Sequence, residues 1–424
     1  MLSRVLPLRV LLVYRHYASS FVFYPWMLAR GGIEVDVVAT VGHPVLHSRF
    51  VQRAEAVKAD DEAFRHAVSQ RLAEGVYGML LFMDEPSRAV FYRGAVDPIV
   101  EPYLPVPRRS ELVKAFSDKE FFQGWCERNG VATPRTVSVA TADEAIALAR
   151  EWDYPVVLKG ATGMGGKAVR VCHSHPDVRA AFGELSAGGN VLAQRFVHGA
   201  IGSTSFVALR GQVGAWTASE KFMSVAKGLG PSAVRRVRND PELGRIAAKI
   251  AAAGEITGIT GFDWMEGAPG EFLVIDPHFG RCTPPAAISH LAGVDLGRAL
   301  RDLLEDTGRK QEPTANHGLV VAMFPQFIEL LFQGEAWTLL RRANPFARHV
   351  RYFFGPWKEA AMSLRVAGSY ISGGAKVFLG RFRRRRVVDL LPAPAAAAAS
   401  SPTSVAVAAV PKVTAVKPRQ VGLA

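Results

Sequence analysis

A glycine-rich segment with two lysines is the first feature of the sequence that could carry chemistry. Residues 156–172 read VVLKGATGMGGKAVRVC, in which glycines and lysines separate two short apolar runs. These are Lys159, Gly163, Gly165, Gly166 and Lys167. Glycine lets backbone N–H groups approach an anion that side chains would keep away, and lysine adds positive charge. The segment therefore predicts a phosphate-binding loop.

Two well-known phosphate loops do not fit this segment. A P-loop has a first glycine, then four residues, then a Gly-Lys pair and a hydroxyl residue after the pair. Ala161 stands at the first of these positions and Ala168 at the last. A dinucleotide-binding loop leads from a strand into a helix, whereas AVRVC alternates like a strand. We therefore predict a hairpin that folds over a triphosphate.

Two aspartates on neighbouring predicted strands could hold a metal ion. Asp263 in GFDWM and Asp276 in VIDPH are 13 positions apart, and the intervening GAPG predicts a hairpin loop. Adjacent strands would bring both carboxylates to one place. Mg²⁺ prefers oxygen ligands and is often held by one or two carboxylates together with phosphate oxygens. An ordinary turn is the alternative role for Asp276, because it precedes Pro277.

Residues 1–108 predict a small α/β domain. Strands and helices alternate there, at 8–14, 24–32, 33–40, 51–74 and 77–85. This alternation indicates a parallel sheet, and continuous apolar runs are typical of strands buried on both faces. The region contains no GxGxxG motif, so we assign no dinucleotide to it.

The following region predicts further helices and strands around the two motifs. Residues 117–130 predict a helix with Ser117 as N-cap and Glu120 at the capping-box position. The later predicted elements are helices at 141–152, 176–186, 242–256 and 293–306, a strand at 191–197, and hairpins at 204–219 and 261–278.

The order of these features resembles the ATP-grasp superfamily of ATP-dependent carboxylate ligases. A lysine at a helix start (Lys119), a strand ending in lysine and a glycine-rich hairpin come first. The segment VLAQRFVHG and the two aspartates follow in the family's order. The resemblance covers roughly residues 8–305, and it depends on order and spacing together rather than on any one motif.

The resemblance implies a site for ATP and Mg²⁺, with Mn²⁺ as an alternative metal. Lysines and the glycine-rich hairpin would bind the phosphates, and the segment QRFV would be the adenine hinge. The residues implied for nucleotide binding are Lys119, Lys159, Gly163, Gly165, Gly166, Lys167, Gln194, Arg195, Phe196 and Val197.

The resemblance also implies metal ligands and catalytic groups. Asp263, Asp276 and His278 would bind the metal, His278 standing where the family has an asparagine. Arg281 would steady negative charge on the transferred phosphoryl group and, with Lys159, is an implied catalytic residue. Both acids are aspartate rather than glutamate, and imidazole is a poorer Mg²⁺ ligand than an amide oxygen.

The expected fold class is α/β, with a Rossmann-like first domain and a two-lobed ATP-grasp domain. The expected parts are 1–108 (pre-ATP-grasp domain), 109–192 (small lobe) and 193–310 (metal-binding lobe) of an ATP-grasp domain over 109–310, 311–390 (basic, partly helical extension) and 391–424 (tail). The Ala- and Pro-rich tail cannot bury enough apolar surface to order itself, so we expect disorder there.

The net charge of +13 lies in the last part of the chain. Residues 341–424 hold 15 Lys+Arg and 2 Asp+Glu, and residues 1–340 hold 36 of each sign. The basic residues are mixed with aromatic ones over 351–386. This pattern fits a helical extension with a solvated charge run, peripheral contact with an anionic membrane through 341–390, or, least well, nucleic acid.

The resemblance implies a carbon–nitrogen ligase, and we expect it to be cytoplasmic. Three scattered cysteines form no disulfide framework and no zinc motif, and the N-terminal apolar run lacks a cleavage site. The predicted reaction converts a carboxylate to an acyl phosphate, which an amine then displaces. An ATP-binding protein without turnover and a small-molecule phosphotransferase are the alternatives.

Overall fold

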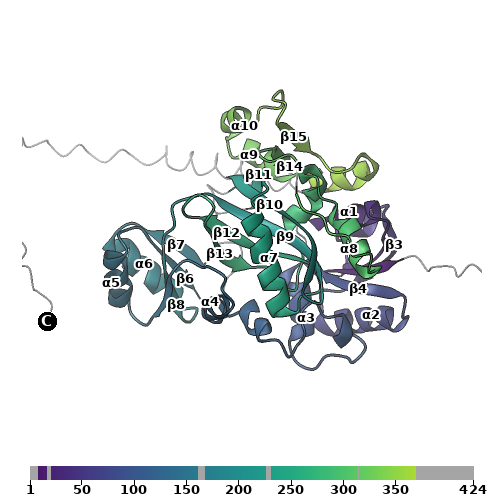
Figure 1. Ribbon diagram of the computed structural model, residues 1–424, viewed down its shortest axis with the longest axis horizontal. Helices are drawn as coiled ribbons and strands as arrows, with labels where there is room; N and C mark the ends of the chain where they lie inside the picture. The colour runs from purple at the N-terminus through teal and green to yellow at the C-terminus, as the bar shows by residue number, and fades with distance from the viewer. Residues whose placement is uncertain (1–7, 17–20, 161–167, 226–230, 314, 369–424) are drawn as a thin grey trace, which may run out of the picture. The chain divides into compact units, whose positions relative to one another are not determined.

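The computed structural model describes residues 8–16, 21–160, 168–225, 231–313 and 315–368, which form three sheets with flanking helices (Figure 1). The glycine-rich residues 161–167 and the tail 369–424 lie outside these ranges. No helix within the described ranges is long and apolar enough to cross a membrane. Short 3₁₀ helices cover Pro44–His47, Glu101–Tyr103, Glu111–Phe116, Pro284–Ala292 and Trp357–Glu359.

The first sheet is parallel, in the order β3-β2-β1-β4. Its strands are β1 (Arg9–Tyr14), β2 (Glu34–Thr40), β3 (Val51–Val57) and β4 (Tyr77–Phe82), with helices α1 (Tyr24–Arg30), α2 (Asp61–Ala73) and α3 (Glu85–Tyr92). The β1 residues from Val10 to Tyr14 are fully buried. This burial agrees with the continuous apolar run, which is typical of a strand covered on both faces.

The helix predicted over residues 51–74 was wrong in its first part. Residues 51–57 form β3, whose side chains alternate between half-buried and exposed beside β2. Such alternation is typical of a strand at the edge of a sheet. The helix α2 begins only after Asp60, whose carboxylate accepts a hydrogen bond from the backbone N–H of Ala63.

The second sheet has the order β5-β8-β6-β7 and carries the strands on either side of the glycine-rich segment. Its elements are α4 (Lys119–Arg128), β5 (Thr136–Val139), α5 (Ala142–Glu151), β6 (Val156–Gly160), β7 (Val169–Cys172), α6 (His175–Ser186) and β8 (Val191–Arg195). Strands β6 and β7 pair antiparallel, with Lys159 opposite Val169. The segment 161–167 therefore joins two strands of a hairpin, as predicted.

The third sheet has the order β13-β12-β9-β10-β11-β14-β15. Its strands are β9 (Ile201–Leu209), β10 (Gln212–Ser224), β11 (Ser232–Arg238), β12 (Gly258–Glu266), β13 (Phe272–Pro277), β14 (Val320–Met323) and β15 (Val350–Phe353). The helices are α7 (Pro241–Gly254), α8 (Leu296–Leu304), α9 (Gln326–Phe332) and α10 (Ala336–Arg342). Because β14 and β15 extend this sheet, it continues past residue 310.

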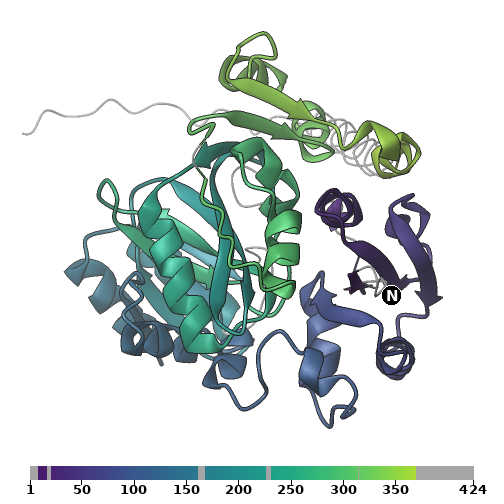
Figure 2. The same cartoon turned by 45° about the vertical axis from the view of Figure 1, so that its right-hand side comes forward.

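Apolar residues of this sheet form two cores. Phe206, Trp216 and Phe262 are buried together with the apolar side of α7, which lies across β9 and β10 (Figure 1). Val207, Ala215 and Val234 belong instead to the core shared with α1 and α8. Figure 2 gives a second view of these layers. A sheet packed on both faces holds its strands rigidly, and polar residues on it are therefore fixed in position.

Candidate active site

Two predicted phosphate-binding lysines lie next to each other. Lys119 is the first residue of α4, which Asp118 caps by accepting a hydrogen bond from the backbone N–H of Phe121. Asp118 is thus the N-cap, and the prediction of Ser117 was wrong by one residue. The ammonium of Lys119 donates to the carbonyl oxygen of Gly160 at 3.2 Å, beside Lys159. Two ammonium groups at the end of β6 form a local positive charge suited to phosphate.

The Lys159 ammonium has an unusual acidity for lysine. Burial lowers its pKa to about 8. The negative charge of Asp276 opposes this shift, and the positive charge of Lys119 adds to it. Among the described residues no acidic side chain forms an ion pair with this ammonium, so an arriving phosphate would replace the hydration that burial removes.

A pocket brings these lysines together with other predicted residues. Lys119, Lys159 and Gln194 line it, and so do Ile275 and Pro277, which flank Asp276 on β13. The second and third sheets therefore both contribute to one pocket. Three residues predicted to bind nucleotide from distant parts of the sequence therefore meet there, next to the two chain neighbours of Asp276.

The predicted adenine hinge follows β8. Gln194 is buried, and its amide donates to the hydroxyl of Thr136 at 2.8 Å. Arg195 is exposed, whereas Phe196 and Val197 are half-buried and leave the sheet beyond the end of β8. The assignment of these residues to an adenine site stays a prediction. Gly163, Gly165, Gly166 and Lys167 lie outside the described residues.

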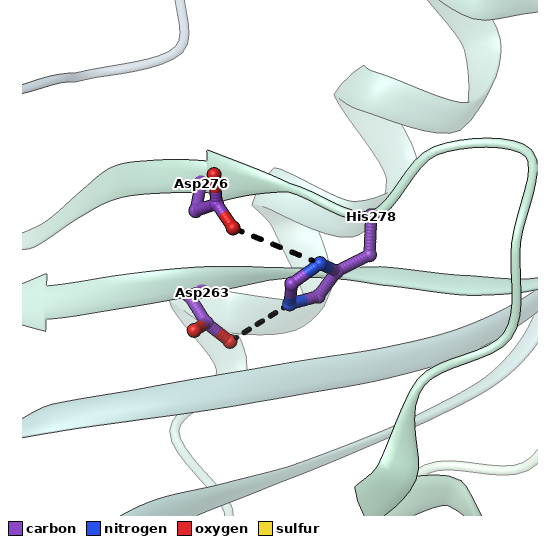
Figure 3. Close-up of side chains that lie close together, drawn as sticks. All are labelled: Asp263, Asp276 and His278. Atoms are coloured by element: carbon purple, nitrogen blue, oxygen red, sulfur yellow. Dashed lines mark hydrogen bonds and ion pairs between the residues drawn. The ribbon is translucent and has the colours of Figure 1, made fainter. Parts of the chain in front are cut away.

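Asp263 and Asp276 are directly opposite each other on the antiparallel strands β12 and β13. His278 follows β13, and its Nε2 lies 3.0 Å from Asp263 Oδ1, while its Nδ1 lies 3.9 Å from Asp276 Oδ2 (Figure 3). One potential ligand atom from each of the three residues lies within 4.8 Å of the others. The sequence prediction that these residues come together is thus met by the geometry, and metal binding stays a proposal.

Asp263 is embedded among donors that sequence reasoning mostly missed. Its Oδ1 accepts from the hydroxyl of Ser203 on β9 at 2.6 Å, and its Oδ2 accepts from the ammonium of Lys221 on β10 at 2.5 Å. Burial alone would raise the pKa of Asp263, but the positive charge of Lys221 and the hydrogen bonds from Lys221 and His278 outweigh burial and hold this pKa well below its usual value. Asp263 is therefore a carboxylate whose charge is already balanced.

Arg235 on β11 completes this polar row across the sheet. Its guanidinium is buried and donates to the hydroxyl of Ser219 at 2.9 Å and to that of Ser203 at 3.3 Å. Burial lowers the pKa of Arg235 to about 10. The sequence signal for this residue is a charged side chain inside the strand SAVRRVR, a position that usually needs a buried partner.

Arg281 contacts the His278 ring. Its Nη2 lies 2.6 Å from His278 Nδ1, so the guanidinium donates to that nitrogen, and Nε2–H of His278 donates to Asp263. A second arginine reaches the same loop from the first domain. Arg88 on α3 is buried, stacks over the Phe116 ring at 4.0 Å and donates to the carbonyl oxygen of Phe279 at 2.5 Å. Sequence reasoning missed Arg88, because nothing local indicates its distant partner.

Comparisons with known proteins identify part of the chain. Residues 118–199 match the family model described as carbamoyl-phosphate synthase L chain, ATP binding domain. The carbamoyl phosphate synthase large chain of Xylella fastidiosa is 35% identical over 95 residues, and that of Vibrio vulnificus is 32% identical over 94. Each match covers 22% of this chain and 9% of the relative.

Solved structures extend the likeness in fold to about 70% of the chain. The alignment with biotin carboxylase from Campylobacter jejuni covers 70% of this chain and 70% of that protein, with a TM-score of 0.53 and 15% identity. N5-carboxyaminoimidazole synthetase from Staphylococcus aureus, complexed with ADP, covers 72% of this chain and 78% of its own, with a TM-score of 0.54 and 14% identity. The chain therefore has the ATP-grasp fold, as the resemblance implied, and residues 118–199 are similar to an ATP-binding domain.

Proposed function

We propose that the chain is an ATP-dependent carbon–nitrogen ligase that activates a carboxylate as an acyl phosphate and joins it to an amine. The observation that carries the proposal is the shared pocket. Lys119 and Lys159 of one sheet line it together with the β13 residues that flank Asp276. Phosphoryl transfer depends on charge neutralisation and alignment more than on covalent help from the protein, and this pocket offers both.

In this proposal each side chain has a defined task. Lys119 and Lys159 bind and align the phosphates of ATP, with the glycine-rich hairpin closing over them. Arg281 stabilises the negative charge of the transferred phosphoryl group, and its hydrogen bond to His278 holds its guanidinium beside the carboxylates. The segment from Gln194 to Val197 binds the adenine. Water exclusion by the hairpin would protect the acyl phosphate from hydrolysis.

The carboxylates fit a divalent cation, with one restriction. Asp276 is half exposed and has no stronger partner than His278 at 3.9 Å among the residues described, so its oxygens are open to Mg²⁺ or Mn²⁺. Asp263 already accepts hydrogen bonds from Lys221, Ser203 and His278. When bound, the cation would neutralise phosphate charge. We therefore propose Asp276 as the main protein ligand of the cation, with Asp263 and His278 as secondary ligands.

The carboxylate and amine substrates would enter from the first domain. The carboxyl ends of β1 and β2 lead into the segments 16–24 and 42–50, and ligands in open α/β sheets usually bind at such an edge. Asp84 after β4 accepts hydrogen bonds from the backbone N–H groups of Arg15 and His16, which fixes the start of the first loop. Arg88 ties the same edge to the loop after β13.

The test is Mg²⁺-dependent ADP release from a pool of amino acids and small carboxylic acids. The proposal expects release that requires a carboxylate, rises with an amine, and is lost in Lys159→Met and in Asp276→Asn. The control Lys58→Met changes an exposed lysine of the first domain and should leave release intact. Release with a carboxylate-free acceptor alone would favour the phosphotransferase. ATP binding with no release from any pool would favour the ATP-binding protein without turnover.

A further inference from the structure

Exposed large apolar side chains are concentrated in one short part of the chain. Among the residues that the structure describes, eleven large apolar side chains are exposed, and six of them lie between residues 331 and 364. The other five are isolated β-branched residues. The six are Leu331, Trp337, Leu340, Phe346, Phe354 and Leu364. They include every exposed Trp and Phe side chain of the described ranges.

Helix α10 places part of this group on one face. Trp337, Leu340 and Arg341 are spaced so that they are neighbours on a helix surface, and all three are exposed. Leu339, on the opposite side, is buried and anchors α10 in the core. Phe346 follows α10 and is 93% exposed, and Trp337 is 71% exposed. The helix is thus fixed to the protein by one side and presents aromatic and aliphatic groups to solvent on the other.

The same segment carries cations without acidic partners. Arg341, Arg342, Arg348 and Arg351 are exposed, and none forms an ion pair with an acidic side chain in the part of the chain that the structure describes. Elsewhere arginine is commonly paired, as in Arg179 with Asp143 and Arg238 with Glu266. Unpaired arginines beside exposed apolar groups define what we call the α10 surface: Trp337, Leu340, Arg341, Phe346 and Arg348. Figure 1 shows α9, α10, β14 and β15 grouped together.

We propose that the α10 surface docks onto an anionic lipid membrane. Tryptophan, phenylalanine and leucine gain free energy by entering the boundary between headgroups and acyl chains, and arginine gains from anionic headgroups. Each contribution is weak alone, and the two together produce stable, reversible binding. The sequence continues the charge pattern after residue 375, where six further Lys and Arg residues lie between 376 and 386.

Other occupants fit these side chains less well. Nucleic acid would pair with the arginines, but Leu331, Leu340 and Leu364 offer it neither charge nor a stacking surface. A second copy of the chain, in a two-fold dimer, would bring the same arginines together across the interface, and like charges repel. An anionic lipid surface accepts both kinds of side chain at once.

The experiment is cosedimentation of the full chain with large vesicles of phosphatidylcholine alone or of phosphatidylcholine and phosphatidylglycerol at seven to three. We expect partitioning onto the anionic vesicles to be about tenfold or more above that on the neutral ones, and to fall as salt rises. Trp337→Ser with Phe346→Ser, and separately Arg341→Gln with Arg348→Gln, should each lower it about tenfold. The matched control, Val76→Ser with Arg245→Gln, changes an exposed apolar and an exposed basic residue elsewhere and should bind normally.

Three results would overturn the proposal. The first is equal sedimentation with and without vesicles. The second is binding that both α10 double variants retain but that removal of residues 369–424 abolishes, which would assign it to the tail. The third is a change of oligomeric state, or of oligonucleotide binding, in the α10 variants without any change on vesicles. None of these measurements depends on turnover, so the proposed ligase activity can fail or succeed separately.

Discussion

The ammonium of Lys221 lies 2.5 Å from Oδ2 of Asp263 and holds the carboxylate that the sequence assigns to a metal ion. The Lys221 side chain is about a quarter exposed and that of Asp263 is 12% exposed, so the pair is mostly shielded from water. A fixed cation at this position supplies positive charge beside the phosphate pocket without a metal. The chain would then need fewer metal ions than two free carboxylates suggest.

Removing that cation should strengthen metal binding. In Lys221→Met the carboxylate of Asp263 loses its charged partner, and we expect the affinity for Mn²⁺ in the absence of nucleotide to rise about tenfold, in line with one opposite charge removed at short range. Electron paramagnetic resonance of free Mn²⁺ measures this directly. The control Lys58→Met should leave Mn²⁺ binding unchanged. Unaltered Mn²⁺ affinity in Lys221→Met would show that Asp263 is not part of a metal site.

The acidity of Lys159 predicts a pH dependence of nucleotide binding. Its pKa of about 8 means that the free chain carries the ammonium below that pH and loses it above. ATP affinity should therefore fall by up to about tenfold per pH unit as pH rises through and beyond 8. Isothermal titration at several pH values measures this fall. Lys159→Arg keeps its charge and should bind ATP with little dependence on pH in this range, and an unchanged slope in that variant would refute the assignment.

The lowered pKa of Lys159 also predicts how stability depends on pH: the free energy of unfolding should rise with pH, whereas ATP affinity should fall. Burial lowers the pKa of Lys159 from 10.5 to about 8, so the unfolded chain binds the proton more tightly than the folded chain. The free energy of unfolding contributed by this residue therefore rises with pH between these two values. Urea titrations of the wild type and of Lys159→Met at pH 7.5 and 9.5 should show a rise in the wild type that the variant lacks.

Arg88 should be important for stability although it lies far from the phosphate lysines. Arg88→Met removes the hydrogen bond to the Phe279 carbonyl oxygen and the stacking on Phe116, and we expect a loss of about 2–4 kcal/mol in the free energy of unfolding. Chemical denaturation gives that value. Arg179→Met removes an exposed ion pair and should cost about 0–1 kcal/mol. Equal losses in the two variants would mean that the Arg88 contacts contribute little.

Gly261 is required by the close approach of β12 to β9. A methyl group at this position would lie 2.0 Å from the carbonyl oxygen of Thr204, which is backbone and cannot move aside without breaking the sheet. Gly261→Ala should therefore cost roughly 3 kcal/mol or more and displace Asp263, two residues away. Gly183→Ala, in the exposed middle of α6 with open space around it, should instead stabilise by about 0.5–1 kcal/mol. Thermal unfolding of the two variants compares them, and similar melting temperatures would contradict the prediction.

The elements of the fold were largely readable from local patterns. The apolar run at residues 8–14 predicted the buried strand β1, and the alternation in AVRVC predicted that the glycine-rich segment joins two strands. Errors arose where two patterns competed. The prediction from sequence extended the helix back over residues 51–57, whereas their alternation of half-buried and exposed side chains is that of an edge strand. Likewise, Ser117 and Asp118 are both good caps, and only the backbone conformation selects between them.

The sequence alone determined which side chains could do chemistry and the order in which they occur: lysines, a glycine-rich hairpin, then two aspartates on a hairpin. The tertiary structure decided what surrounds them. Ser203 and Asp263 are 60 positions apart and become neighbours through strand pairing, and Lys221 and Arg235 join them from two further strands. Pairing register between distant strands is set by packing of the whole sheet rather than by local sequence. For that reason the balanced charge of Asp263 and the contact of Arg88 with the loop after β13 could be found only in the folded chain.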